Sequence, residues 1–224
     1  MIKAIVTDIE GTTSSLSFVK EILFPYARDH LADFIRDNLE NQQVKALLND
    51  AGREAGANLN TDQLIALFQE WMEQDKKVTP LKSLQGLIWE DGYHQGAFKG
   101  HLYPDAVENL KAWKAQGLDL YIYSSGSVFA QKLLFSHTEY GDLTPLFSGY
   151  FDTHIGGKKE KLSYLRIAEQ LNCLPQQLLF LSDIKEELDA ARLAGFETVW
   201  LCRDKQHDEH AEHEQVSSFD QIRF

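Results

Sequence analysis

The stretch AIVTDIEGTTSS, residues 4–15, is an apolar run that ends in two acids, a glycine and four hydroxyl-bearing residues. Its first residues are small or β-branched, which favours a strand that is covered on both faces. Asp8 and Glu10 come where this strand ends, and the small residues behind them leave space. In open α/β sheets, ligands bind beyond the carboxyl ends of the strands. The stretch therefore predicts a buried strand that carries two acids to a ligand site.

Further short apolar runs have the same strand-like composition as the first. They are LDLYIYSS at 118–125, LLFLSD at 178–183 and ETVWLCR at 197–203. Amphipathic helical patterns accompany them at 103–117, 159–172 and 185–195. Strands that alternate with helices imply right-handed crossover connections and a parallel sheet. The sequence therefore predicts an α/β fold with a doubly wound, Rossmann-like parallel sheet.

One long segment interrupts this alternation, because it contains helical patterns and no convincing strand. Three of the patterns gather apolar residues on one face: Leu31, Phe34, Ile35 and Leu39; Val44, Leu47, Leu48 and Ala51; Leu64, Leu67, Phe68, Trp71 and Met72. Thr61 is the predicted N-cap of the third pattern. Pro25 is expected to begin a helix or to kink one. We therefore predict an all-helical cap at 16–98, inserted into a core formed by 1–15 and 99–224.

Size and charge limit the classes of function. The 224 residues suffice for a sizeable core, and the formal net charge of −12 disfavours a nucleic-acid partner, because it repels polyphosphate backbones. The N-terminal MIKAIVTD enters a strand directly, and no stretch is apolar over the thickness of a bilayer. We therefore expect a cytoplasmic protein without a membrane partner. Cys173 and Cys202 lack CxxC spacing and are expected to be free thiols.

Polar or reactive residues follow four of the strand-like segments. They are Asp8 and Glu10; Ser124, Ser125, Gly126 and Ser127; Gly156, Gly157 and Lys158, which follow YFDTHI; and Ser182 and Asp183. An acid at a strand end can simply cap the next helix, and for Asp183 alone this explanation is as good as a functional one. It does not explain the whole set. We therefore expect the set to form a ligand site.

These residue types together suit the transfer of a phosphoryl group. Such a group carries negative charge on its equatorial oxygens, so its site needs cations and preorganised N–H donors. Asp8 and Asp183 would hold Mg²⁺, and Lys158 would supply a second cation. The N–H groups of SSGSV at a helix start would bind the phosphate. Asp8 could attack phosphorus, while Glu10 could protonate the leaving oxygen and then activate water.

Four segments, in this order, resemble the motifs of a known family. DIEGTT, YIYSSGS, FDTHIGGKKE with Lys158, and FLSDIKEELDAA are similar to the four motifs of the haloacid dehalogenase-like phosphohydrolases. The resemblance implies a Rossmann-like core, an aspartate nucleophile and, for most members, a requirement for Mg²⁺. A helical cap inserted after the first motif also fits this superfamily. Each motif is weak by itself, whereas the ordered set is a strong signal.

Two longer segments resemble a narrower family, the enolase-phosphatases of methionine salvage. They are TDIEGTTSSLSFVKEILFPYARDHL and YSSGSVFAQKLLFSHTEYGDLTPLFSGYFDTHIGGKKE, and the similarity runs through most of residues 1–203. Members of this family enolise 2,3-diketo-5-methylthiopentyl-1-phosphate and then remove its phosphate, which yields an acireductone. The resemblance implies a small phosphorylated diketone as substrate, one Mg²⁺ per chain and a monomer.

The resemblance also implies a role for each matching residue. Asp8 is the expected nucleophile and a metal ligand. Glu10 is the expected acid/base and also holds the metal, which in this superfamily is often through the main-chain oxygen. Asp183 is a further expected metal ligand. The residues expected to hold the phosphate are Ser124, Ser125 and Lys158.

Several details of this interpretation stay open. The family pattern favours Lys158 over Lys159, although a solvated lysine at a helix start is the commonest explanation of either. Glu187, one turn after Asp183, is expected to orient metal-bound water. The usual first motif is Asp-x-Asp, so the extra methylene of Glu10 is hypothesised to reach the diketone or a carbon-bound proton. The base that removes this proton has no recognisable spacing.

Two other functions compete with this one. A phosphomonoesterase for another small metabolite would use the same residues, and a non-catalytic protein that binds a phosphorylated ligand could share the fold. A dehalogenase is disfavoured, because the departure of halide needs no Mg²⁺.

The segment DKQHDEHAEHEQ, residues 204–215, is rich in charge and poor in apolar residues. His207, His210 and His213 are spaced every three residues, which suits a metal site on a helix. A solvated tail is nevertheless expected, because almost no apolar residue anchors the segment.

Overall fold

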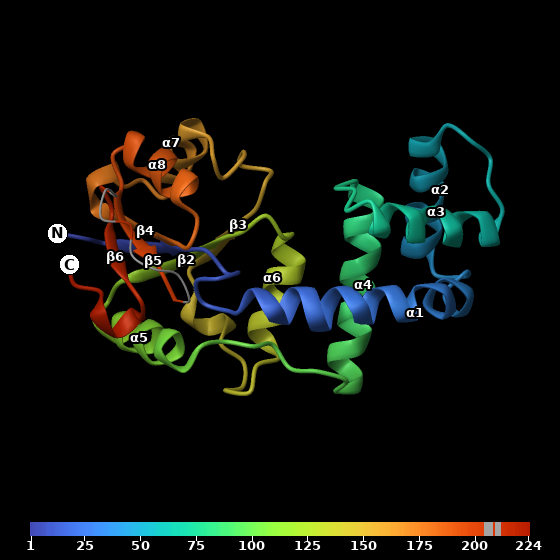
Figure 1. Cartoon of the computed structure of the whole chain (residues 1–224), viewed down its shortest axis with the longest axis horizontal. Coiled ribbons are helices and arrows are strands. Elements are labelled where there is room, and N and C mark those ends of the chain that lie inside the picture. The colour runs from blue at the N-terminus through green and yellow to red at the C-terminus, as the bar shows by residue number, and fades with distance from the viewer. Residues whose placement is uncertain (204–207, 209–211) are drawn as a thin grey trace. The chain divides into compact units, whose positions relative to one another are not determined.

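The computed structural model describes residues 1–203, 208 and 212–224. Among these residues, the sheet has six parallel strands in the order β3-β2-β1-β4-β5-β6 (Figure 1). The strands are β1 (Ala4–Thr7), β2 (Asp119–Tyr123), β3 (Gly149–Phe151), β4 (Leu178–Ser182), β5 (Glu197–Leu201) and β6 (Glu214–Val216). The winding changes direction between β1 and β4, which is the switch point of a doubly wound sheet. The predicted α/β fold is confirmed.

The central strand β1 is buried on both faces, as its apolar sequence predicts. Every residue of β1 and of β4 is buried. Thr7, the last residue of β1, lies level with Ile122 of β2 and Leu181 of β4. Because the three parallel strands end at nearly the same level, the residues that follow them gather at one edge of the sheet.

Helices cover both faces of the sheet. In this part of the chain they are α5 (Pro104–Ala115), α6 (Val128–Ser136), α7 (Lys161–Gln170) and α8 (Lys185–Leu193), with 3₁₀ helices at Thr144–Leu146, Pro175–Gln177 and Phe219–Gln221. α7 and α8 lie on one face and α5 on the other (Figure 1). On the first face, Val6 and Phe180 of the sheet pack with Tyr164 of α7 and Leu188 of α8. The three helices predicted from sequence are all present.

The described residues group into two compact units. One unit is Met1–Phe18 with Gly100–Phe224, called the core unit below, and the other is Val19–Lys99, the helical unit. The helices of the second are α1 (Phe24–Asp37), α2 (Gln42–Ala55), α3 (Thr61–Glu73) and α4 (Thr79–Gln95), preceded by a π-helical stretch at Phe18–Leu23. The predicted domain boundaries, with a cap at 16–98, stay a prediction, because compactness does not show that a segment folds independently.

The first turns of α1 and α3 bear on two predictions about the helical unit, the role of Pro25 and the N-cap at Thr61. Pro25 lies in the first turn of α1, where a proline is tolerated, and the π-helical stretch Phe18–Leu23 precedes this turn directly. The structure therefore does not separate the two predicted alternatives for Pro25. Thr61 is not the N-cap of α3. The cap is Asn60, whose side chain accepts from the Gln63 N–H at 3.0 Å, while the Gln63 side chain accepts from the Asn60 N–H at 2.9 Å. This reciprocal capping box explains why the helix begins one residue earlier than predicted.

The prediction of a solvated tail is wrong for the described residues at its end. Glu214–Val216 form β6, which pairs with β5. The His213 side chain is fully buried, and its ring nitrogens lie 2.8 Å from Thr198 Oγ1 and from Asp189 Oδ1. The sequence pattern does not reveal this strand, because the strand is short and is anchored by polar partners. His207 and His210 lie outside the described residues.

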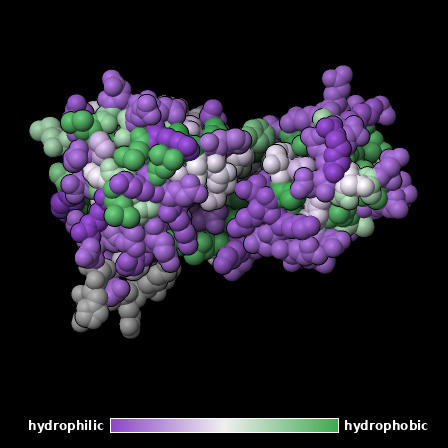
Figure 2. Space-filling model, turned by 90° about the horizontal axis from the view of Figure 1, so that it is seen from above, coloured by the Kyte–Doolittle hydropathy of each residue, from purple (hydrophilic) through white to green (hydrophobic). Residues whose placement is uncertain are grey.

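The surface and the two cysteine side chains have the properties that the composition predicts. Figure 2 shows one face of the molecule, on which hydrophilic residues cover most of both units and apolar residues form smaller groups. None of the described helices is both long enough and apolar enough to cross a membrane. Cys173 and Cys202 are free thiols, as predicted.

Candidate active site

The turn after β1 is a compact loop that brings Asp8 to the edge of the sheet. The N–H groups of Thr12, Thr13 and Ser14 all donate to Ile9 O, at 3.2, 3.0 and 2.8 Å. Thr13 Oγ1 also donates to Asp8 O at 3.2 Å. These bonds hold the backbone of the first predicted motif in one conformation, so the direction of the Asp8 side chain is set by the loop.

Gly11 lets Asp183 approach this loop closely. Gly11 has a φ of +75°, and a Cβ atom there would lie 2.5 Å from the Asp183 carboxyl carbon. Only a residue without a side chain fits such a position. Asp183 follows β4, the strand next to β1, and is buried. The structure thus places the Asp183 carboxyl group against the backbone of the loop that carries Asp8 and Glu10.

Lys158 lies between two carboxylates at the centre of the site. Its Nζ is 2.6 Å from Asp8 Oδ1 and 2.6 Å from Glu187 Oε2, and the three side chains are 6%, 6% and 10% exposed. Ser182 Oγ donates to the same Glu187 oxygen at 2.9 Å. The Tyr164 hydroxyl donates to Lys158 O at 2.6 Å, which fixes the backbone behind the ammonium group. We call Asp8, Lys158 and Glu187 the buried triad.

The pKa values of Asp8 and Lys158 are shifted by burial and by the other charges of the buried triad, which contains two acids and one ammonium group. Burial raises the pKa of Asp8 to about 7; Lys158 opposes this shift and Glu187 adds to it. For Lys158, burial acts to lower the pKa, but Asp8 and Glu187 outweigh it and raise the pKa above its usual range. One ammonium group offsets one of two carboxylates, so negative charge is in excess when both acids are ionised.

The loop after β2 carries the predicted phosphate-binding residues and leads into α6. Ser127 is the N-cap of α6, and its side chain accepts from Ala130 N at 3.2 Å. Gln131 Nε2 donates to Gly126 O at 2.8 Å and ties the loop to its own helix. Ser124 is buried and accepts from Gly126 N at 3.2 Å, whereas Ser125 is exposed. A helix N-terminus of this kind can bind an anion.

The donor set at the loop after β1 fits a hard divalent cation. Among the described residues, no group of three His, Cys, Asp or Glu side chains forms a metal site by itself. The loop contributes the Asp8 carboxyl group and the main-chain carbonyl of Glu10. The Asp183 carboxyl group lies against the same loop. Mg²⁺ takes oxygen ligands of this type and usually keeps several waters. The excess negative charge near Asp8 agrees with such a cation.

The structure brings most, but not all, of the predicted residues into direct contact. Asp8 touches Lys158, and Asp183 lies against the loop of Asp8. Glu10 forms a bridge with Ser14 within the turn and is partly exposed. Lys159 points elsewhere, since its side chain is 64% exposed and its Nζ lies 3.9 Å from Glu186 Oε2.

Sequence reasoning missed two partners of this site, Arg203 and His101. It named Glu187 as a residue that orients metal-bound water, and the structure shows that Glu187 contacts Lys158. Arg203 donates from Nε to Thr12 O at 2.8 Å and forms two bonds of 3.1 Å with the Asp105 carboxylate, so it ties the loop to Asp105. His101 bonds the same loop at Ser14 and Ser15. A single arginine or histidine far from the motifs has no spacing that would have identified it.

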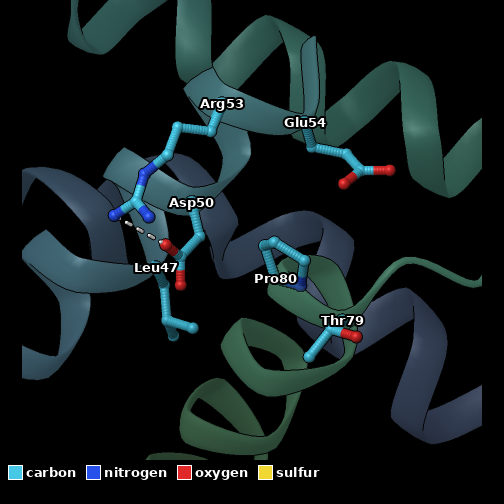
Figure 3. A pocket seen from close by; sticks show the side chains of 6 residues that line it. All are labelled: Leu47, Asp50, Arg53, Glu54, Thr79 and Pro80. Carbon is cyan, nitrogen blue, oxygen red and sulfur yellow. Dashed lines mark ion pairs between the residues drawn. The ribbon is translucent and has the colours of Figure 1, made fainter. Parts of the chain in front are cut away.

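A separate pocket of about 360 Å³ lies in the helical unit and is unrelated to the triad. It is lined by Leu47, Asp50, Arg53, Glu54, Thr79 and Pro80, the first four from α2 and the last two from α4 (Figure 3). Arg53 and Asp50 form an ion pair at its wall, with Nη2 and Oδ1 3.1 Å apart (Figure 3). No residue there matches a predicted site residue, so the pocket carries no functional assignment.

Comparisons with known proteins agree with the geometry. The family model of the haloacid dehalogenase-like hydrolases matches residues 2–195. The chain is 57% identical over 224 residues to Enolase-phosphatase E1 from Methylococcus capsulatus, covering all of this chain and 98% of that protein. It is 55% identical to Enolase-phosphatase E1 from Serratia proteamaculans, with 99% and 97% covered.

Solved structures extend the agreement to three dimensions. The Unknown transcript 4 protein from Saccharomyces cerevisiae aligns with a TM-score of 0.85 at 32% identity, over 99% of this chain and 100% of that one. A haloacid dehalogenase-like phosphatase from Thermococcus onnurineus aligns with a TM-score of 0.62 at 17% identity, over 98% and 95%, which supports the fold alone. The chain therefore belongs to the haloacid dehalogenase-like hydrolases and, within them, to the family of proteins named Enolase-phosphatase E1.

Proposed function

We propose that this protein is a Mg²⁺-dependent enolase-phosphatase of methionine salvage. It converts 2,3-diketo-5-methylthiopentyl-1-phosphate to the acireductone 1,2-dihydroxy-3-keto-5-methylthiopentene and phosphate. The observation that carries the chemistry is the buried contact between Lys158 and Asp8 at the switch point of the sheet. The choice of substrate rests on the full-length similarity to proteins named Enolase-phosphatase E1.

In this proposal, Asp8 is the nucleophile of the phosphatase step. One of its carboxylate oxygens forms a bond to phosphorus while the ester P–O bond breaks, and Glu10 gives its proton to the leaving oxygen. Glu10 then takes a proton from water, which attacks phosphorus, releases phosphate and restores Asp8. Lys158 offsets charge on the transferring group. Its contacts with Asp8 and Glu187 support this role, because they fix the ammonium group before substrate binds.

The phosphate is proposed to lie at the start of α6. Ser124, Ser125 and the main-chain N–H groups near Ser127 would bind its oxygens, together with Lys158. The capping bond from Ala130 N to Ser127 Oγ and the bond from Gln131 to Gly126 O support this placement, since they preorganise the loop without a ligand.

One Mg²⁺ per chain is proposed to be held by Asp8, Asp183 and the main-chain oxygen of Glu10. When bound, it supplies positive charge beside the transferring phosphoryl group. The raised pKa of Asp8 supports this assignment, because a cation would relieve the unbalanced charge that burial and Glu187 create there. Glu187 is proposed to position Lys158 rather than metal-bound water.

Glu10 is proposed to act in the enolase step as well. A glutamate is one methylene longer than the aspartate usual at this position, so its carboxylate can reach the hydrogen on the phosphate-bearing carbon. Glu10→Asp is expected to slow enolisation more than hydrolysis of a simple phosphate monoester. Equal rates of both steps in the variant and the parent would contradict this role.

The decisive experiment is a Mg²⁺ titration with the diketone phosphate, in which released phosphate and the ultraviolet absorbance of the enediol are followed together. Both signals are expected to rise only with the metal, and Asp8→Asn is expected to abolish phosphate release. Release of phosphate from many unrelated esters, but not from this one, would instead favour a general phosphomonoesterase. Binding of the phosphorylated ligand without turnover would favour a non-catalytic protein.

The protein is further proposed to act as a cytoplasmic monomer, on the basis of its family resemblance alone. Sedimentation equilibrium at micromolar concentration tests the oligomeric state. A mass of twice that of the chain would contradict it.

A further inference from the structure

His101 is bonded to the loop that carries the proposed catalytic acids. It lies in the core unit, in the connection that leads into α5. Its Nδ1 is 3.1 Å from the Ser15 N–H and 3.3 Å from Ser14 Oγ. Ser14 in turn forms a bridge with Glu10, and its carbonyl accepts from Gly11 N at 2.7 Å. The imidazole therefore sits beside the residue that pairs with Glu10.

The bond to Ser15 decides which ring nitrogen of His101 carries the proton. A main-chain N–H can only donate, so Nδ1 must offer a lone pair. A neutral imidazole in this arrangement carries its proton on Nε2. No partner within the described part of the chain accepts a hydrogen bond from that Nε2. The ring thus presents a fixed N–H donor that none of the described residues uses.

The surroundings of His101 keep the ring oriented and neutral. The ring of Phe18 lies 6.4 Å away, and that of Tyr103 packs edge-on at 5.1 Å. Burial lowers the pKa of His101 below its usual range; the charge of Glu139 opposes this shift and that of Arg203 adds to it. A neutral imidazole can stabilise a developing oxyanion by donating a hydrogen bond to it.

We propose that His101 is a further catalytic residue of the enolase step, whose Nε2–H donates to a carbonyl oxygen of the diketone. This assignment rests on the proposed function. In the step, the C–H bond of the phosphate-bearing carbon breaks and its proton goes to the Glu10 carboxylate. The electron pair forms the C=C bond, and the adjacent carbonyl becomes an enolate oxygen that accepts the hydrogen bond from His101. The solvent finally supplies a proton to this oxygen and regains one from Glu10 when the cycle ends.

A purely structural role for His101 makes the opposite predictions in two matched variants. His101→Asn keeps an acceptor near the position of Nδ1 for the Ser15 N–H but lacks a donor where Nε2 lies. His101→Gln places an amide N–H donor near the position of Nε2 and loses the acceptor. If His101 only ties the loop, the asparagine variant retains activity. If it donates to substrate, the glutamine variant does.

The test measures the two half-reactions separately. Washout of hydrogen from the phosphate-bearing carbon into D₂O, followed by NMR in an Asp8→Asn background, reports enolisation without loss of phosphate. Hydrolysis of a simple alkyl monophosphate without carbonyl groups, with Asp8 intact, reports the phosphatase step. His30→Gln, an exposed histidine of the helical unit, is the control.

For His101→Asn, the ratio of washout to monoester hydrolysis is expected to fall about 100-fold, the usual effect of removing one oxyanion donor. His101→Gln is expected to recover at least part of this loss, and His30→Gln to behave as its parent. An unchanged ratio in His101→Asn would overturn the proposal while leaving the proposed function intact. If the parent protein forms neither enediol nor phosphate from the diketone, the proposed function fails, and the role of His101 fails with it.

Discussion

The edge of the sheet in the core unit and the interior of the helical unit bury very different side chains. At the sheet edge, an ammonium group and two carboxylates are almost completely removed from water. The core of the helical unit is a cluster of buried apolar residues, including Leu31, Phe68 and Leu84. Its ion pairs lie on the surface, as in Arg36 with Asp62, whose side chains are 54% and 81% exposed.

The difference shows which region is built for stability and which for chemistry. An exposed ion pair contributes about 0–1 kcal/mol, whereas buried charges cost several kcal/mol of desolvation that their attraction only partly returns. The helical unit follows the ordinary rule that amphipathic helices bury one apolar face. The buried triad departs from this pattern, because it buries charged side chains. Groups with such perturbed pKa values cluster at functional sites. Substitutions in the buried triad should therefore change activity, whereas substitutions in the core of the helical unit should change stability alone.

The largest effect is expected for Asp8→Asn. Loss of the nucleophile should lower kcat for phosphate release by about 10⁴-fold or more. Phosphate release measured with saturating Mg²⁺ checks this loss. Residual activity within tenfold of the parent would show that Asp8 is not the nucleophile.

Asp8→Asn should also reveal the cost of the buried charge. The folded-state pKa of Asp8 is raised from 3.8 to about 7, so the unfolded chain releases this proton at lower pH than the folded one. The stability of the metal-free parent should therefore fall as pH rises from about 4 to 7, and stay level above that. Denaturant unfolding should show that the stability of the variant, relative to that of the parent, increases between about pH 4 and 7. A difference independent of pH would contradict the raised pKa.

Lys158→Gln is expected to reduce both activity and stability. It leaves Asp8 and Glu187 as neighbouring buried acids, which should cost about 3–5 kcal/mol of unfolding free energy. Loss of the charge beside the phosphoryl group should lower kcat about 100- to 1000-fold. Lys159→Gln is the matched control, because that side chain is 64% exposed. A larger loss of activity in the control would transfer the phosphate-binding role to Lys159.

In the helical unit, Phe68→Ala should lower the stability of the protein and leave its catalytic rate almost unchanged. Phe68 is fully buried and packs edge-on against Trp71, with ring centroids 5.5 Å apart. Removing it should cost about 3–5 kcal/mol of unfolding free energy. The kcat for a simple monoester at low temperature, where the protein stays folded, should change less than about twofold. Ile22→Ala, at an exposed residue, is the control. A large loss of kcat in the folded variant would contradict the separation of roles.

The smallest effect concerns the pH dependence of metal binding. Mg²⁺ must displace the proton from Asp8, whose pKa is raised to about 7. Below that pH, the dissociation constant of Mg²⁺ should rise about tenfold for each unit, and above it the affinity should level off. Calorimetric titrations between pH 5 and 8 measure this slope, and Asp8→Asn should remove it. A flat affinity across the range would argue against Asp8 as a ligand.

How far the sequence predicts the structure differs between elements. The strands β1, β2, β4 and β5 were predicted because each is an apolar run between turn residues. β6 was not, because its three residues follow a charged segment and are held by pairing with β5. The cap of α3 was misplaced by one residue because Asn60 and Thr61 are both good N-caps.

The sequence by itself determined the alternation of strands and helices, the helical insertion and the acids at the strand ends, because these are local patterns of polarity and residue type. Only the tertiary structure decided that Lys158 lies between Asp8 and Glu187 and that Gly11 admits Asp183. It also decided that His101 has an N–H with no acceptor among the described residues, beside the turn of Glu10. Such contacts join residues from different strands and loops, and their strength depends on burial. Neither distance nor burial is encoded in a local pattern, so both appear only when the chain has folded.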